Sequence, residues 1–186
     1  MVTRMRIIGG QAAGRRLAPV RGGRTRPTGA RVREALFNIW QSRIVEATFL
    51  DAYAGTGAMG LEAISRGARH VTFCEPDRRA LKTIYENIQR MDVASKTRVL
   101  GKPLEAALPH WATEGTQFDI IFCDPPWQVG LMPAVVKMLW QIVNHAGIVV
   151  VESRASDPVV ELNGLSLEWT RRYGDTRVSQ YLRNPD

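Results

Sequence analysis

The sequence predicts an α/β protein with a mostly parallel seven-stranded sheet and helices on both of its faces. Three observations support this fold class. From residue 48 onward, short apolar stretches alternate with segments whose apolar residues recur at helical spacing. A glycine-rich stretch separates the first expected strand from the first helix of this region, where parallel α/β sheets bind ligands. Two further strand-like stretches close the chain around a Gly-Asp pair.

The first residues do not follow this alternation and form a separate extension. Short apolar pieces alternate with glycine over residues 6–20, which predicts a small hairpin. A helix is expected from about residue 30 to 41, with Thr28 as its N-cap. Its apolar residues form one face at helical spacing, and Arg31 and Arg33 are expected to lie off that face.

The main part of the chain contains the elements of the sheet and its covering helices. Strands are expected near residues 48–53, 70–75, 97–100, 118–123 and 147–152, and helices near 58–66, 77–91, 103–109 and 130–143. Residues 165–173 and 176–183 flank Gly174-Asp175 and are expected to form an antiparallel hairpin at the edge of the sheet.

The positive charge of the chain is concentrated at its amino end. The 186 residues carry a net charge of +7, and residues 1–33 contain nine arginines, no lysine and no acidic residue. One guanidinium group can donate two hydrogen bonds to a phosphate. The arginines therefore favour a nucleic-acid partner over the alternative that this segment is solvated and binds nothing. The arginines expected to contact RNA are Arg4, Arg6, Arg15, Arg16, Arg24, Arg26, Arg31 and Arg33.

The composition argues against membrane insertion and metal binding. No apolar run approaches the roughly 20 residues needed to span a bilayer, and no leader-like segment follows the first residues, so a cytoplasmic location is expected. Cys74 and Cys123 form no C-x-x-C pair, and His70, His110 and His145 are widely spaced. We therefore expect no metal site and no disulfide.

The glycine-rich stretch predicts a nucleoside cofactor. Residues 51–60 follow the first strand of the sheet, and Gly55, Gly57 and Gly60 match the pattern G-x-G-x-x-G. Glycine permits a sharp turn and lets a ligand approach the backbone closely. Glu75 ends the next strand, where its carboxylate can accept both hydroxyls of a ribose.

This pattern alone fits NAD as well as S-adenosylmethionine, and two details favour S-adenosylmethionine. Asp51 places an acid beside the expected pocket, where a carboxylate suits an ammonium group and repels a pyrophosphate. The second detail is Asp-Pro-Pro-Trp at the end of the fourth strand, which hydride transfer does not need and amine methylation does.

The Asp-Pro-Pro-Trp segment, residues 124–127, predicts the reaction centre. The two prolines end the strand stiffly and leave carbonyl oxygens able to accept hydrogen bonds. Asp124 and the Pro125 carbonyl can accept the two N–H bonds of an exocyclic amine, while Trp127 stacks on the base. These three residues are the candidate catalytic group. The alternative interpretation is a strand-terminating turn with a buried tryptophan.

Several segments resemble known methyltransferases. Residues 49–63 and 65–68, together with the D-P-P-aromatic motif, resemble the amino-group class of Rossmann-like methyltransferases. Four further segments resemble the RsmD family more narrowly: residues 6–10, 26–28, 31–38 and 173–176. Taken together, the resemblance covers nearly the whole chain. The family's aromatic residue after D-P-P is commonly Tyr or Phe, and this chain has Trp127.

The resemblance implies a Rossmann-like class I fold and methyl transfer from S-adenosylmethionine to the exocyclic N2 of a guanine in bacterial 16S ribosomal RNA. It implies an RNA-binding extension over residues 1–41 and a methyltransferase domain over 42–186. The expected partner is 16S rRNA in a small-subunit assembly particle, and a monomer is favoured. The expected cofactor contacts are Asp51, Tyr53, Gly55, Gly57, Gly60, Glu75, Pro76 and Asp124.

Two other functions stay open from the sequence. A DNA adenine-N6 methyltransferase would share the D-P-P site, although the chain has no obvious DNA-specificity domain. A non-catalytic RNA-binding module would account for the arginines but would leave the glycine pattern and the D-P-P segment without a role.

Overall fold

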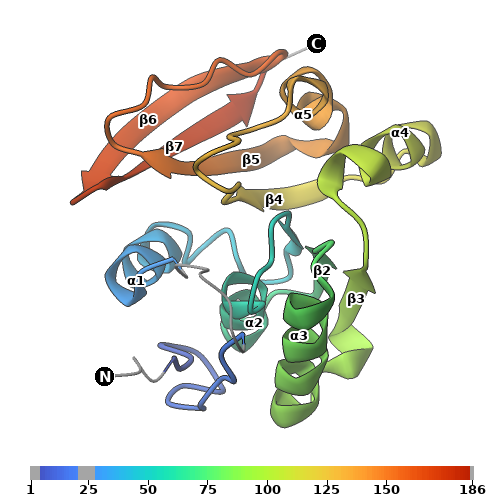
Figure 1. Ribbon diagram of the computed structural model, residues 1–186, viewed down its shortest axis with the longest axis vertical. Helices are drawn as coiled ribbons and strands as arrows, with labels where there is room; N and C mark the ends of the chain where they lie inside the picture. Colours follow the sequence, from blue (N-terminus) through green and yellow to red (C-terminus); the bar gives the residue numbers. More distant parts are fainter. Residues whose placement is uncertain (1–4, 21–27, 185–186) are drawn as a thin grey trace.

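One seven-stranded sheet organises the computed structural model, which describes residues 5–20 and 28–184 (Figure 1). Its strands are β1 (Thr48–Asp51), β2 (His70–Cys74), β3 (Thr97–Leu100), β4 (Phe118–Cys123), β5 (Val143–Arg154), β6 (Leu165–Tyr173) and β7 (Thr176–Arg183). In space they follow the order β3-β2-β1-β4-β5-β7-β6. Strands β1 to β5 run parallel, and β7 pairs antiparallel with both β5 and β6. The predicted α/β class and the edge hairpin are confirmed.

The helices cover both faces of the sheet (Figure 1). One face carries α1 (Ala30–Ile39), α2 (Ala58–Ser65) and α3 (Arg78–Met91), and the other carries α4 (Leu104–Glu114) and α5 (Pro133–Met138). Two short 3-10 helices complete the path, η1 (Ala94–Lys96) and η2 (Leu139–Ile142). Within the described residues, none of the helices combines the length and apolarity that a membrane crossing requires.

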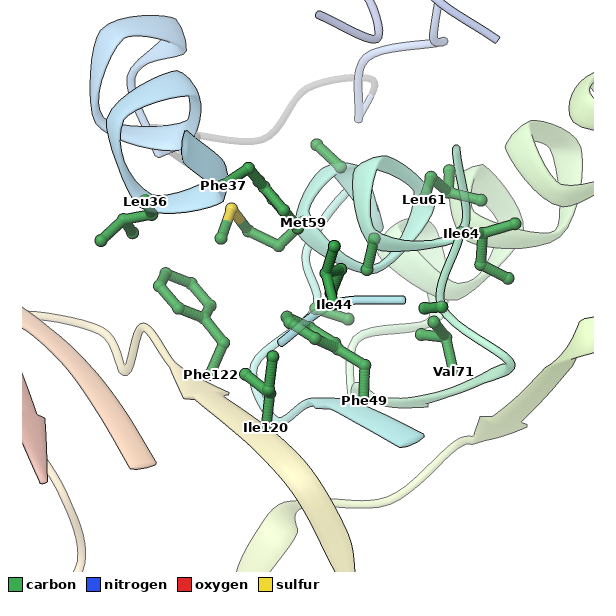
Figure 2. Close-up of a cluster of buried hydrophobic side chains, with 14 of the residues drawn as sticks. Leu36, Phe37, Ile44, Phe49, Met59, Leu61, Ile64, Val71, Ile120 and Phe122 are labelled. Carbon is green, nitrogen blue, oxygen red and sulfur yellow. The ribbon is translucent and has the colours of Figure 1, made fainter. Parts of the chain in front are cut away.

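Alternate residues of the central strands pack into two separate cores. Phe49, Ile120 and Phe122 belong to the core beneath the first three helices, whereas Leu50 and Ile121 face α4 and α5. This division follows from the period of two in a strand. Figure 2 shows the first core, where side chains of β1 and β4 lie below those of α1 and α2. Helix α1 of the extension therefore shares a core with the sheet.

The predicted amino-terminal hairpin is present in a reduced form. A single antiparallel bridge joins Arg6 to Arg16, and the Ile7 N–H donates to the Arg15 carbonyl at 3.0 Å. Ile7 and Leu17 are buried in the same core as α1. The hairpin is thus packed against the domain and is not a free arm.

Two helices differ from the sequence prediction. Helix α4 continues past Pro109, which is a helix-breaking residue, because Leu108 and Trp111 on the same helix are fully buried. The helix expected over 130–143 is shorter, because the chain tightens into η2 and then enters β5, where Val143 pairs with Phe118. Apolar spacing alone cannot distinguish these endings.

Candidate functional site

A cavity of about 710 Å³ lies at the carboxyl ends of the parallel strands. Parallel strands end at the same edge of a sheet, and so loops distant in sequence meet there. Its walls come from the glycine-rich loop, the end of β2, the Asp-Pro-Pro-Trp segment and the end of β5. The predicted residues that line it are Asp51, Tyr53, Gly55, Glu75, Pro76, Asp124, Pro125 and Trp127.

The three glycines of the loop have different roles. Gly55 lines the cavity at φ +54°, and a Cβ there would meet no atom within 4 Å. Gly57 and Gly60 are not among the lining residues, and their contact with the cofactor stays a prediction. Gly57 is the left-handed N-cap of α2, and a Cβ on Gly60 would lie 2.3 Å from the Phe73 ring. Gly60 therefore permits close packing of α2 on β2.

Glu75 is held at the end of β2 by backbone amides. Its Oε2 accepts the Gly55 N–H at 2.8 Å, and its Oε1 accepts the Asp77 N–H at 2.9 Å. Burial raises the pKa of Glu75, while these two hydrogen bonds act in the opposite direction. A carboxylate oxygen can accept more than one hydrogen bond, and so Glu75 can still bind ribose hydroxyls.

Asp51 and Tyr53 also place polar groups in the wall of the cavity. Asp51 is only 2% exposed, and its Oδ2 accepts the Gly60 N–H at 3.0 Å. Burial raises the pKa of Asp51 to about 7, with a smaller contribution from Glu75. The Tyr53 hydroxyl is buried and finds no hydrogen-bond partner among the residues that the structure describes. Such a group is costly without a partner, which a polar ligand would supply.

These observations fit S-adenosylmethionine. The ammonium group of the cofactor would neutralise buried Asp51, and its ribose hydroxyls would hydrogen-bond the Glu75 carboxylate. The open space beside Gly55 admits a ligand close to the backbone. Within the ranges that the structure describes, no group of His, Cys, Asp and Glu side chains could hold a metal ion. Cys74 and Cys123 are both buried as free thiols, and burial raises the pKa of each.

Asp124 lines the same cavity, next to a second acid, Glu152. Its pKa is raised well above the ordinary value by burial first, then by the charges of Glu152 and Asp51. A hydrogen bond from the Thr28 side chain acts in the opposite direction. The lining of this cavity includes six acidic residues, which favour a ligand with positive charge or several N–H donors.

Thr28 is a site residue whose role the sequence did not predict. It was expected to cap α1, yet Gly29 occupies the N-cap position and no side chain caps the helix. Thr28 is instead buried, lines the cavity and hydrogen-bonds Asp124. A preference for threonine at N-caps is local, whereas this contact joins residues 96 positions apart in the chain. In the sequence, only the position of Thr28 within residues 26–28, a segment that resembles the RsmD family, pointed to a functional role.

The Asp-Pro-Pro-Trp segment makes a stiff corner with an aromatic plane. The Pro126 carbonyl accepts the Val129 and Gly130 N–H groups at 2.9 Å, which leaves Pro125 as the carbonyl for an amine. The Arg154 guanidinium lies 5.5 Å from the centre of the Trp127 ring. A second hollow beside this ring is lined by Arg154, Arg172 and Asp175.

The arginines predicted to contact RNA are exposed, buried or outside the described residues, and only Arg33 is buried among those that the structure describes. Arg6, Arg15, Arg16 and Arg31 are exposed. Arg4, Arg24 and Arg26 lie outside the described residues.

Arg33 does not fit the prediction. It is 3% exposed, its guanidinium donates to the Arg6 carbonyl at 2.7 Å, and its Nε lies 3.5 Å from the Glu62 Oε2. Both its expected position off the buried face of α1 and its expected phosphate contact are wrong. Helical spacing places Arg33 beside Val32 without showing that α2 supplies it with a buried carboxylate.

Comparisons with known proteins identify the family of this chain. A family model described as Conserved hypothetical protein 95 matches residues 5–182. The Bacillus subtilis protein YlbH is 34% identical over 181 residues, which cover 95% of this chain and 98% of that protein. An Escherichia coli protein named ribosomal RNA small subunit methyltransferase D is 41% identical over 135 residues, covering 73% of this chain and 66% of the relative.

A solved structure shows the same architecture over almost the full length. The Escherichia coli methyltransferase yhhF matches with a TM-score of 0.84 and 36% identity, covering 97% of this chain and 98% of that one. The sheet order and the two helical layers are therefore those of a Rossmann-like methyltransferase. The chain belongs to the family described as Conserved hypothetical protein 95, the RsmD family, which includes the ribosomal RNA small subunit methyltransferase D proteins.

Proposed function

We propose that this protein transfers a methyl group from S-adenosylmethionine to the exocyclic N2 amine of one guanine in small-subunit ribosomal RNA. The observation that carries the proposal is that one cavity is lined by Asp51 and Glu75 together with Asp124 and Trp127. The first pair suits the cofactor, and the second suits an aromatic amine. The relative named ribosomal RNA small subunit methyltransferase D supports the choice of RNA.

The cofactor end of the site is built from groups already placed by the backbone. Asp51 would bind the ammonium group of S-adenosylmethionine, Glu75 its ribose, and the Tyr53 hydroxyl a further polar group. When bound, the cofactor supplies an electrophilic methyl group on a positively charged sulfur. Its charge also favours the ionised forms of the buried carboxyls, including Asp124.

The target end of the site orients the nucleophile. The lone pair of an exocyclic amine is delocalised into the base until its hydrogens are held out of the ring plane. Asp124 and the Pro125 carbonyl can accept those two hydrogens, and Thr28 fixes the Asp124 carboxylate. Because the lone pair is then aimed along one direction, proximity and orientation account for much of the rate. Once the nitrogen becomes cationic, its proton is acidic and needs no strong base.

The base must leave its stack to reach this site. Extrusion costs a few kcal/mol, less where the base is already unpaired. Stacking on Trp127, worth roughly 1–3 kcal/mol, offsets part of that cost. One small domain makes few base contacts, which favours a target recognised by the shape of a folded RNA or of a partly assembled small-subunit particle. The exposed arginines of the extension would bind phosphates around it.

The test is methyl transfer to small-subunit particles from cells that lack this activity. Wild-type protein with labelled S-adenosylmethionine should yield N2-methylguanine on digestion of the RNA. Asp124→Ala should lose at least about a thousandfold in kcat while the protein stays folded and still binds RNA, because the carboxylate positions the target amine. Activity of Asp124→Ala within threefold of wild type would contradict the mechanism. Label in N6-methyladenine of duplex DNA, and none in ribosomal RNA, would contradict the substrate.

A further inference from the structure

Glu152 is a buried carboxylate that lines the cavity near Asp124, and the methyl-transfer mechanism gives it no role. It is 4% exposed and lines the cavity together with Asp124, Pro125 and Trp127. It lies near the carboxyl end of β5, two residues before that strand ends at Arg154. A buried acid at this edge calls for an explanation because burial disfavours its charge.

The sheet register places Glu152 beside Asp124. Cys123 of β4 pairs with Val151 of β5, and so the next residues of the two parallel strands are Asp124 and Glu152. Neighbouring strands lie roughly 5 Å apart. Ile148 and Val150 precede Glu152 at a spacing of two and face the core beneath α1, which is also the face of Phe122. Both carboxyls therefore project from the same face of the sheet.

Two adjacent acids match the hydrogen-bond pattern of guanine better than that of other bases. On its Watson–Crick edge, guanine presents the N1–H donor directly beside the N2 amine. Adenine and cytosine each present a ring nitrogen that accepts, next to their exocyclic amine. A carboxylate facing that ring nitrogen would hydrogen-bond guanine and repel the other two bases.

We propose that Glu152 selects guanine by accepting the N1–H of the target base, while Asp124 and the Pro125 carbonyl hold its N2 amine. This inference rests on the proposed function and adds a specificity-determining residue to it. The charge of Glu152 already acts on Asp124, since it raises the pKa of that carboxyl. A bound guanine would supply hydrogen-bond donors to both acids and relieve this repulsion.

The experiment compares two RNA substrates that differ at the target position. The position is first mapped with labelled methyl groups, and its guanine is then replaced by 2,6-diaminopurine. This base keeps the N2 amine but has an acceptor in place of the N1–H and an amine in place of O6. Sites built to bind an N–H discriminate strongly against analogues that lack it, so wild type should prefer guanine by at least about a hundredfold in kcat/KM.

Glu152→Gln should change this preference, because a carboxamide can donate to the acceptor of 2,6-diaminopurine. We expect the guanine preference to fall at least about tenfold, with cofactor affinity kept. The control is Glu161→Gln, which makes the same substitution at an exposed acid and should leave the preference for guanine unchanged.

An equal loss of activity on both substrates in Glu152→Gln would show that Glu152 only supports the fold. Because that variant could also misfold, the wild-type preference is an independent measurement. A wild type that methylates both RNAs equally would overturn the role of Glu152 while leaving guanine-N2 methylation intact. A wild type that labels neither RNA would overturn the proposed function itself, and this inference with it.

Discussion

Asp51 both holds the glycine-rich loop and lines the cavity. Its carboxylate accepts the Gly60 N–H, which ties the start of α2 to the end of β1, and it also lines the cavity. Burial raises its pKa to about 7, far above the ordinary value of 3.8. Near neutral pH the group is therefore only partly ionised in the free protein, and a cation in the cavity would complete its ionisation.

Cofactor affinity should consequently increase with pH. Only ionised Asp51 binds an ammonium group well, and its ionised fraction rises from about one tenth at pH 6 to about one half at pH 7. The cofactor amino group stays largely protonated over this range, since ordinary α-amino groups have a pKa of about 8. We expect the affinity for S-adenosylmethionine to rise about fivefold between these pH values, as measured by calorimetry.

Asp51→Asn provides the matched comparison, because its amide oxygen can still accept the Gly60 N–H. Burial also raises the pKa values of Glu75 and Asp124, and so both could add to the slope. The informative quantity is the difference between wild type and variant. The assignment to Asp51 would be wrong if both proteins showed the same pH dependence.

At the scale of elements, Glu62 fastens the extension to the domain. This residue of α2 is fully buried and accepts the Ile8 and Gly9 N–H groups at 2.8 Å each. It also lies 2.8 Å from the Arg66 Nε and 3.5 Å from the Arg33 Nε. One carboxylate therefore joins the hairpin, α1 and α2. These elements border Thr28, which reaches the cavity.

Removing this carboxylate should strongly destabilise the protein. Glu62→Ala leaves the buried Arg33 guanidinium without its counter-charge, and breaking such a pair costs about 3–5 kcal/mol in the free energy of unfolding. The measurement is denaturant unfolding. Glu86→Ala is the control, because the Glu86–Arg90 pair is about half exposed and should contribute no more than about 0.5 kcal/mol.

A double variant separates the lost charge pair from the lost hydrogen bonds. Glu62→Ala combined with Arg33→Met removes both charges and should recover part of the stability. The interpretation fails if Glu62→Ala costs no more than Glu86→Ala. It also fails if the double variant is as unstable as the sum of its two single variants.

At the scale of the whole molecule, the positive charge is concentrated in residues 1–33, and the rest of the chain is slightly acidic. Arg6, Arg15, Arg16 and Arg31 are exposed, while the hairpin between them contributes Ile7 to the core. Deleting the hairpin would therefore damage the fold as well as RNA binding. Substitutions of exposed arginines test the RNA contacts without this complication.

Arg15→Gln with Arg16→Gln should weaken RNA binding and reduce its dependence on salt. Each lost phosphate contact should lower the slope of log affinity against log salt by roughly 0.7–0.9. The comparison is Lys96→Gln with Arg98→Gln, which removes two exposed charges at β3, an edge strand of the sheet. Equal slopes in the two double variants would show that the hairpin arginines do not contact RNA.

Local patterns in the sequence determined most of the fold. Strand residues at a spacing of two and helix residues at 3.6 located every strand of the sheet and its principal helices. The glycine-rich loop, Glu75 and the Asp-Pro-Pro-Trp segment were located because each directly follows a recognisable strand. In a parallel sheet, that position fixes the edge at which they meet.

Contacts between distant segments were decided by the tertiary structure alone. The Thr28–Asp124 hydrogen bond, the Arg33–Glu62 pair and the neighbouring positions of Asp124 and Glu152 each join residues at least 28 positions apart. Periodicity shows which face of an element is apolar, but it does not show which element covers that face. An arginine that looks like a phosphate contact in the sequence can therefore be the partner of a buried carboxylate, and a strand acid such as Glu152 can line the cavity.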